Sequence, residues 1–185
     1  MTRLVPLAAV IGFLLAAPVA PRAADATATP SWLKADAAAK TAEFDVVAAF
    51  NENNSNWNFN GYHTGNATVL VPPGWTVQVP FHNQEDEIPH SLIVIADPGD
   101  PEKHPSEAGQ DVAAFAGAYT GNPVEGTAKG EPGAFTFRAD KPGDYLWYCG
   151  VPGHGSAGMW IRFRVAGDVQ APAVTLASDA EPGRE

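Results

Sequence analysis

Apolar and polar residues alternate along much of the chain after residue 43. The segments Trp57-Asn58-Phe59-Asn60-Gly61-Tyr62 and Trp75-Thr76-Val77-Gln78-Val79-Pro80-Phe81 follow this alternation, which indicates half-buried strands. Clusters of Gly, Pro and Asn, such as Pro72-Pro73-Gly74, separate such segments and indicate turns. The pattern therefore predicts an all-β protein.

About eight short strands are expected, at residues 44–50, 57–62, 67–71, 75–81, 90–95, 135–138, 145–148 and 159–165. Their spacing of roughly ten residues, with turn signals between them, is typical of β-sandwiches and barrels. We therefore predict an antiparallel Greek-key sandwich or barrel.

Other regions flank or interrupt this domain, which we place at residues 43–166. Residues 31–40 are Ala-rich, with Ser31 as a candidate cap, so a short helix is expected in an N-terminal arm at 27–42. Residues 97–132, which we call the excursion, are rich in Pro, Gly and charge and predict a long functional or flexible loop. Residues 167–185 are polar and predict a disordered tail.

The first 26 residues have the features of an export signal. Arg3 gives a basic start, residues 4–20 are almost wholly apolar, and Ala24-Asp25-Ala26 fits a small-residue cleavage site. The alternative is an uncleaved membrane anchor, which Pro6 and Pro18 disfavour. We therefore expect an exported protein, periplasmic or otherwise extracytoplasmic, with membrane contact only if this segment is retained.

Composition bears on the size of the core and on the binding partners. Of 185 residues, 45% are hydrophobic, with five Trp and nine Phe, which suffices for the core of one domain, expected to be a monomer. The net charge of −10 argues against nucleic acid and anionic membranes, and it would steer the protein toward basic partners unless it serves solubility alone.

Sulfur-containing residues are scarce. Cys149 is the only cysteine, so no internal disulfide can form, and a free thiol outside the cytoplasm is open to oxidation. If the signal is removed with Met1, Met159 becomes the only methionine. We therefore expect Cys149 to be occupied by a ligand.

Cys149, His154 and Met159 follow one another with four residues between each pair. A thiolate, an imidazole and a thioether in one loop suit copper, whose blue sites use two His, one Cys and a weak axial Met. The second histidine must come from another segment, and His90, at the start of an apolar strand, is the natural candidate.

Other chemistries fit these residues less well. A structural zinc site usually has paired cysteines, and a thioether is a poor zinc ligand. A cysteine protease would need an orienting residue beside its Cys–His pair, and none is evident. Copper is therefore the predicted cofactor.

The loop resembles that of cupredoxins, and in particular the sulfocyanin and rusticyanin group. These proteins share the Tyr148-Cys149-Gly150-Val151-Pro152-Gly153-His154 pattern, followed after four residues by Met159, and the serine of His90-Ser91. The 57–62 stretch and the Val71-Pro72-Pro73-Gly74-Trp75 turn also resemble sulfocyanins. The resemblance covers residues 31–166.

The resemblance implies a cupredoxin fold with one blue, type-1 copper ion. His90, Cys149 and His154 would be equatorial ligands and Met159 the axial one. His154, on the exposed loop, would be the electron port, surrounded by a docking patch of small residues at 151–157. The resemblance assigns no ligand role to His82, expected at the surface or beside the ligands, and His104 is expected to be solvated.

The function that follows is one-electron transfer between redox proteins, such as cytochromes or a terminal oxidase, and not enzyme catalysis. A copper storage or delivery protein remains an alternative. A copper-dependent redox enzyme or its accessory domain is another, although additional copper sites need further histidines, and His63, His82 and His104 are the only others.

Overall fold

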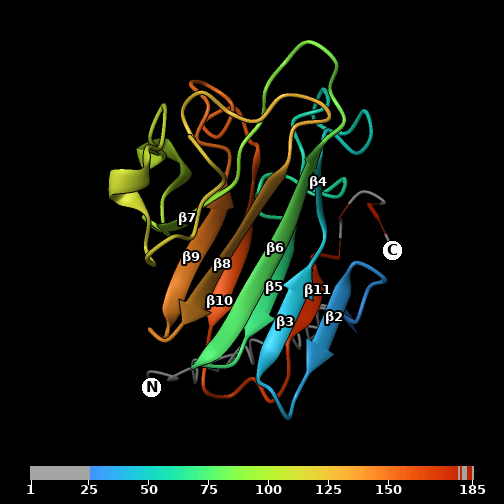
Figure 1. The fold of residues 1–185 in the computed structure, drawn as a ribbon, viewed down its shortest axis with the longest axis vertical. Coiled ribbons are helices and arrows are strands. Elements are labelled where there is room, and N and C mark those ends of the chain that lie inside the picture. The colour runs from blue at the N-terminus through green and yellow to red at the C-terminus, as the bar shows by residue number, and fades with distance from the viewer. Residues whose placement is uncertain (1–25, 179, 181–182, 185) are drawn as a thin grey trace, which may run out of the picture.

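A computed structural model describes residues 26–178, 180 and 183–184, so the predicted signal peptide lies outside the described residues except for Ala26. Within this part of the chain, eleven strands form two sheets (Figure 1), which confirms the all-β sandwich. In the part of the chain that is described, the helical segments are two 3-10 turns, η1 at Pro101–Lys103 and η2 at Gln110–Val112.

The larger sheet has six strands in the order β1-β11-β5-β10-β9-β7. Its members are β1 (Ala26–Ala28), β5 (Ala67–Val71), β7 (Ile93–Ala96), β9 (Gly143–Tyr148), β10 (Trp160–Val165) and β11 (Ala173–Leu176). Strands β5 and β10 run parallel, and the other neighbouring pairs of this sheet are antiparallel.

The second sheet is built around the long strand β6 (Trp75–Asn83). Strand β8 (Gly133–Ala139) pairs antiparallel with one of its edges. The other edge holds two short strands, β3 (Thr41–Phe44) and β4 (Val46–Ala48), both parallel to β6, and β2 (Leu33–Asp36) pairs with β3. The predicted purely antiparallel arrangement is therefore wrong: both sheets are mixed, and they do not close into a barrel.

The predicted helix at 31–40 is also wrong. In its place, β2 and β3 form an antiparallel hairpin that places Leu33 opposite Phe44. Lys40, at the turn, has a φ of 51°. Trp32 and Leu33 are both buried in this arrangement, and burial of apolar side chains outweighs the helical preference of alanine, since propensity alone is a weak determinant of structure.

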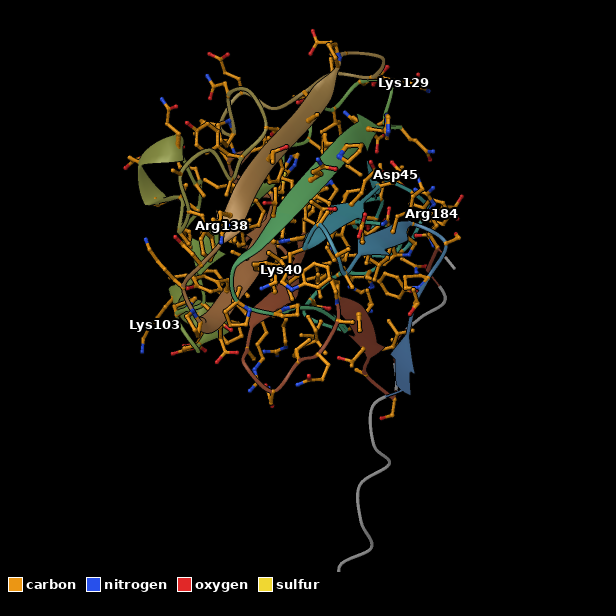
Figure 2. The ribbon with its side chains drawn as sticks, turned by 60° about the horizontal axis from the view of Figure 1, so that its bottom comes forward. Lys40, Asp45, Lys103, Lys129, Arg138 and Arg184 are labelled. Carbon is orange, nitrogen blue, oxygen red and sulfur yellow. The ribbon has the colours of Figure 1, made fainter. Side chains whose placement is uncertain are left out.

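The predicted disorder of residues 167–185 does not hold for β11, which lies between β1 and β5 with Val174 buried. Near the end of the chain, Arg184 donates hydrogen bonds to the backbone and to the carboxylate of Asp45, the latter at 2.8 Å (Figure 2). Alternation of small apolar residues in 173–176 was too short to distinguish a strand from a tail.

The core lies between the sheets. Along β6, every second side chain is buried, and the alternate positions are more exposed, as a period of two requires. Aromatic rings fill the middle: the ring of Trp147 stacks on Phe163 at 5.8 Å and meets Phe44 edge-on at 5.4 Å.

The excursion covers the free edge of β7. The N–H of Ala114 donates to Val94 O, and the N–H of Val94 donates to Ala118 O, so a strand edge that would otherwise be unpaired is satisfied. The excursion also covers the outer face of the sheet, where a second apolar cluster forms from Ile93, Ile95, Ala108, Leu146, Tyr148 and Trp160. It is thus an ordered layer and not a free loop.

No helix among the described residues has the length and apolar character needed to cross a bilayer.

Replacing Gly150 with Ala will lower the free energy of unfolding by about 1–3 kcal/mol, the usual cost of adding atoms to a packed interior. A Cβ atom at this position would overlap the carbonyl oxygens of Ala108 and Pro123 in the excursion. Denaturant unfolding of the metal-free protein measures the change. Gly121→Ala, in the same excursion but with open space around it, is the control and should stay within about 0.5 kcal/mol of the parent. Equal effects would contradict the close packing at Gly150.

Candidate metal centre

The predicted site residues come from two segments at one end of the sandwich. His90 precedes β7, and Cys149, His154 and Met159 belong to the 149–159 loop, which joins β9 to β10. His90 and His154 are 64 residues apart in sequence. The pairing of β7 with β9, which places Ile93 opposite Tyr148, carries the two segments to the same end of the sheet.

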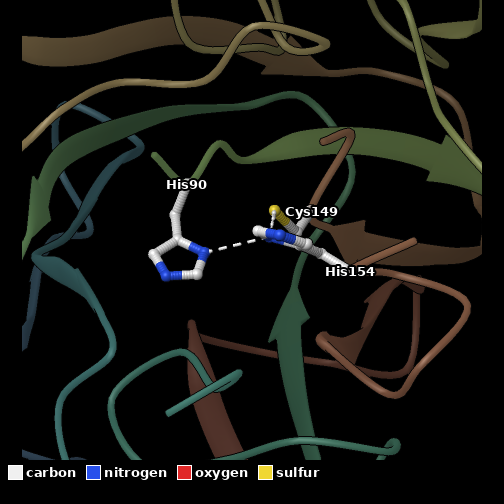
Figure 3. A group of neighbouring side chains, drawn as sticks. All are labelled: His90, Cys149 and His154. Atoms are coloured by element: carbon white, nitrogen blue, oxygen red, sulfur yellow. Dashed lines mark hydrogen bonds between the residues drawn. The ribbon is translucent and has the colours of Figure 1, made fainter. Parts of the chain in front are cut away.

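The side chains of His90, Cys149 and His154 converge (Figure 3). The Nδ1 atoms of the two histidines are 3.2 Å apart, and Cys149 Sγ is 3.6 Å from Nδ1 of His154. One donor atom from each residue lies within 4.8 Å of the others, and all three residues are buried. Such a cluster is compact enough for one ion to bind all three donors.

Cys149 is fully buried. Burial raises the pKa of its thiol to about 11, and N–H groups that donate to sulfur, including that of Ser91 at 3.5 Å, oppose this rise. The metal-free thiol is therefore protonated at neutral pH. The same N–H groups would stabilise the negative charge of a thiolate bound to a cation.

The environment of both histidines favours the neutral imidazole. Burial, followed by the proximity of His154, lowers the pKa of His90 to about 4, and burial also lowers the pKa of His154. A neutral imidazole keeps a lone pair for a metal ion. Nδ1 of His90 is the nitrogen that faces the cluster, 3.2 Å from Nδ1 of His154, and Nε2 of His90 is buried without a hydrogen-bond partner.

Met159, the fourth predicted residue, is fully buried and closes the loop. The N–H of Met159 donates to the carbonyl of His154, and the carbonyl of Met159 accepts from the N–H of Cys149, both at 3.0 Å. The three residues of the loop are therefore joined through their backbones, which holds the backbone of Met159 next to those of Cys149 and His154.

Ser91 links this loop to the excursion. Its buried hydroxyl donates to the carbonyl of Pro123 at 2.7 Å and accepts from the N–H of Gly150 at 2.9 Å. A second link runs from the N–H of Gly153 to the carbonyl of Ser106 at 2.7 Å. The excursion thus positions the 149–159 loop, a role that the sequence did not indicate.

Trp57 is a site residue that the sequence reasoning missed. Its ring stacks on the ring of His154, with centroids 4.4 Å apart and planes at 26°. His154 was expected to lie on an exposed loop; residues of that loop such as Ser156 are exposed, but only 7% of His154 itself is accessible. The signal was present, because Trp57 opens one of the stretches that resemble sulfocyanins, but its alternating pattern was attributed to a strand.

Two other histidines lie apart from the cluster. His82 is exposed, with Nε2 3.1 Å from the carboxylate of Asp45. His104 is half-buried and not solvated as expected, because its ring packs edge-on against Tyr148 and Trp160 at 5.7 and 4.7 Å. Burial lowers the pKa of His104.

The donor set indicates which ion fits. Two imidazoles and one thiolate, with a buried methionine nearby, are the set preferred by a copper ion that changes between two oxidation states. Structural zinc sites favour four N/S ligands with several cysteines, and Cys149 is the only cysteine of the chain. The cluster therefore fits copper better than zinc.

Comparison with known proteins shows sequence similarity to sulfocyanins. The model of the sulfocyanin (SoxE) domain matches residues 28–176. Sulfocyanin from Sulfolobus acidocaldarius is 32% identical over 136 residues, which cover 72% of this chain and 67% of that protein.

Two solved structures are also similar. The structure of auracyanin A, a "blue" copper protein from Chloroflexus aurantiacus, is 19% identical, with a TM-score of 0.48, over 68% of this chain and 99% of that one. The structure of rusticyanin from Thiobacillus ferrooxidans is 21% identical, with a TM-score of 0.41, over 69% of this chain and 82% of that one.

The domain match runs from the last residue of β1 to the end of β11 and includes every residue of the His–Cys–His cluster. Together, the match and the cluster confirm the predicted cofactor, one copper ion. On this evidence, the chain belongs to the sulfocyanin family of cupredoxins.

Proposed function

We propose that the protein is a one-electron carrier in which His90, Cys149 and His154 are the equatorial ligands of a blue copper ion and Met159 is its axial ligand. The observation that carries this proposal is the convergence of two Nδ1 atoms and one Sγ atom in a buried cluster. Copper bound there supplies the one-electron change between Cu(I) and Cu(II).

The protein would control that change through the surroundings of Cys149. Hydrogen bonds from N–H groups to sulfur and an apolar, dry environment both tune the potential of such sites. Leu92 and Trp147 are fully buried near the cluster. Low polarity disfavours the more highly charged Cu(II) state, so we expect a high potential.

Burial also favours electron transfer over catalysis. His90, Cys149 and Met159 have no accessible surface, and His154 has 7%. A substrate would need an open coordination position and a path to it, whereas an electron needs neither. We therefore infer that the protein is not an enzyme.

The partners would be redox proteins outside the cytoplasm, such as a cytochrome or a terminal oxidase. The net charge of −10 favours a partner with a basic surface, because complementary charges speed association.

Mixing the reduced protein with a ferric cytochrome c in a stopped-flow instrument tests the proposal. Rapid oxidation that slows as salt is added is expected, and absence of exchange would favour copper storage or delivery.

Copper(II) loading will give an intense visible band, because a thiolate bound to copper undergoes charge transfer. Cys149→Ser will abolish this band while the far-ultraviolet circular dichroism stays unchanged. Absorption and EPR spectra of both proteins measure the result. A colourless copper-loaded parent would rule out the blue site.

Met159→Gln will keep a coloured site and lower its reduction potential, because an oxygen ligand stabilises Cu(II) more than a thioether does. Voltammetry of the variant and the parent measures the shift. An unchanged potential would show that Met159 is not the axial ligand.

Copper binding will release one proton for each ion between about pH 7 and 9. The metal-free thiol, whose pKa is raised to about 11, is protonated in this range, and the imidazoles, whose pKa values are lowered, are already neutral. Affinity should therefore rise about tenfold per pH unit, because higher pH removes the proton that competes with copper. A pH indicator in weakly buffered solution measures the release, and Cys149→Ser is the control.

A further inference from the structure

The proposed copper ligands are almost completely buried, so a redox partner has little direct access to them. Of the four proposed ligands, only His154 has any accessible surface, and this amounts to 7%. The stacked ring of Trp57 lies against it and is itself partly exposed. Trp57 is therefore an aromatic group in contact with both a proposed ligand and the solvent.

The backbone before Trp57 is held in an unusual conformation. Asn54, Ser55 and Asn56 have φ values of 51°, 55° and 69°. The left-handed region is unfavourable for side chains other than glycine, although Asn tolerates it better than most. Three in succession persist only where surrounding contacts fix them, so the position of Trp57 is strongly specified.

Asn54 provides the main fixing contacts. Its Nδ2 donates to the carbonyl of Trp57 at 2.8 Å and to the carbonyl of Ala157 at 3.4 Å. The N–H of Trp57 donates to the carbonyl of Asn54 at 3.0 Å. Trp57 is thus joined to the 149–159 loop through one side chain, and its ring and the ring of His154 are held as a unit.

A second layer of amide contacts supports this turn. Asn58, which is fully buried, donates through Nδ2 to the carbonyls of Asn51 and Asn53, both at 2.8 Å. Its Oδ1 accepts from the N–H groups of Phe50 and Gly61. With both ends of this amide satisfied, the turn is rigid at its base, which a mere surface loop would not require.

We propose that Trp57 is a positioning residue for His154 and the contact through which electrons pass between the site and the redox partner. This inference rests on the proposed function. Copper bound at the site would supply the electron and an oxidised one-electron partner would accept it; Trp57 would be neither oxidised nor reduced and would mediate the electronic coupling. The exposed residues of the adjoining loop, Pro152, Ser156 and Ala157, are uncharged, so the partner would approach Trp57 without losing hydration of a charge.

Two substitutions at Trp57 separate the effect of its aromatic ring from the effect of its apolar bulk. Trp57→Phe keeps a flat ring over His154, and Trp57→Leu keeps apolar bulk without one. Asn54→Gly is an independent variant. Glycine adopts the left-handed backbone readily, so this substitution removes only the side-chain amide that holds Trp57. Val112→Ala, at an apolar residue of the excursion that is 47% exposed, is the control for loss of an exposed apolar side chain.

The first measurement uses metal-free protein. We expect diethyl pyrocarbonate to modify His154 several-fold faster in Trp57→Leu and in Asn54→Gly than in the parent, as read by peptide mass spectrometry. Trp57→Phe and Val112→Ala should react at the parent rate. Equal rates in all variants would show that Trp57 does not cover His154 and would overturn the positioning role.

The second measurement is the electron self-exchange rate of copper-loaded protein, from NMR line broadening. Trp57→Leu should lower it by about tenfold or more, since small misplacements of reacting groups have large effects on rate, and Trp57→Phe should stay close to the parent. An unchanged or faster rate in Trp57→Leu would show that partners reach His154 directly and would overturn the proposal. Failure of the proposed function itself would instead appear in the parent, as absence of a blue band or of exchange.

Discussion

The hydroxyl of Ser91 joins the three segments that enclose the copper site. It belongs to the segment before β7, accepts a hydrogen bond from Gly150 in the 149–159 loop and donates one to Pro123 in the excursion. The N–H of the same residue faces the sulfur of Cys149. Because all these groups are buried, each hydrogen bond that is lost would leave an unpaired group at a cost of about 1–3 kcal/mol. The side chain of Ser91 therefore helps to hold the ligand positions, the loop and the outer layer together, alongside the backbone link from Gly153 to Ser106.

The ligand candidates were predictable from the sequence because they are chemically rare in it. One cysteine and one methionine outside the first residue, spaced around a histidine, have few explanations other than a soft metal ion. The prediction of His90 rested on weaker grounds, namely its place at the start of an apolar strand. The structure places its Nδ1 atom 3.2 Å from Nδ1 of His154. The strands were also largely predictable, since β6 and β8 alternate clearly between buried and exposed positions.

Features that depend on distant contacts were not predictable. The helix expected at 31–40 reflected local propensity, whereas Leu33 pairs with Phe44 in a hairpin. The parallel pairing of β5 with β10 and of β3 with β6 leaves no local pattern. Trp57 was visible as an aromatic residue, but its stacking on His154 depends on a left-handed turn and on Asn54. Sequence alternation reports which face a residue occupies, not which neighbour it meets.

The separation of 64 residues between His90 and His154 has a consequence for folding. The intervening chain holds β7, the excursion, β8 and β9, so the two imidazoles meet only after β7 has paired with β9. Contacts of such long range form slowly, because loop closure must precede them. In a partly folded chain, Cys149 and His154 would be near each other because they are close in sequence, but His90 would not yet lie beside them. The blue colour would then measure the fraction of molecules that have completed folding, and its rate of appearance would follow the last step of assembly.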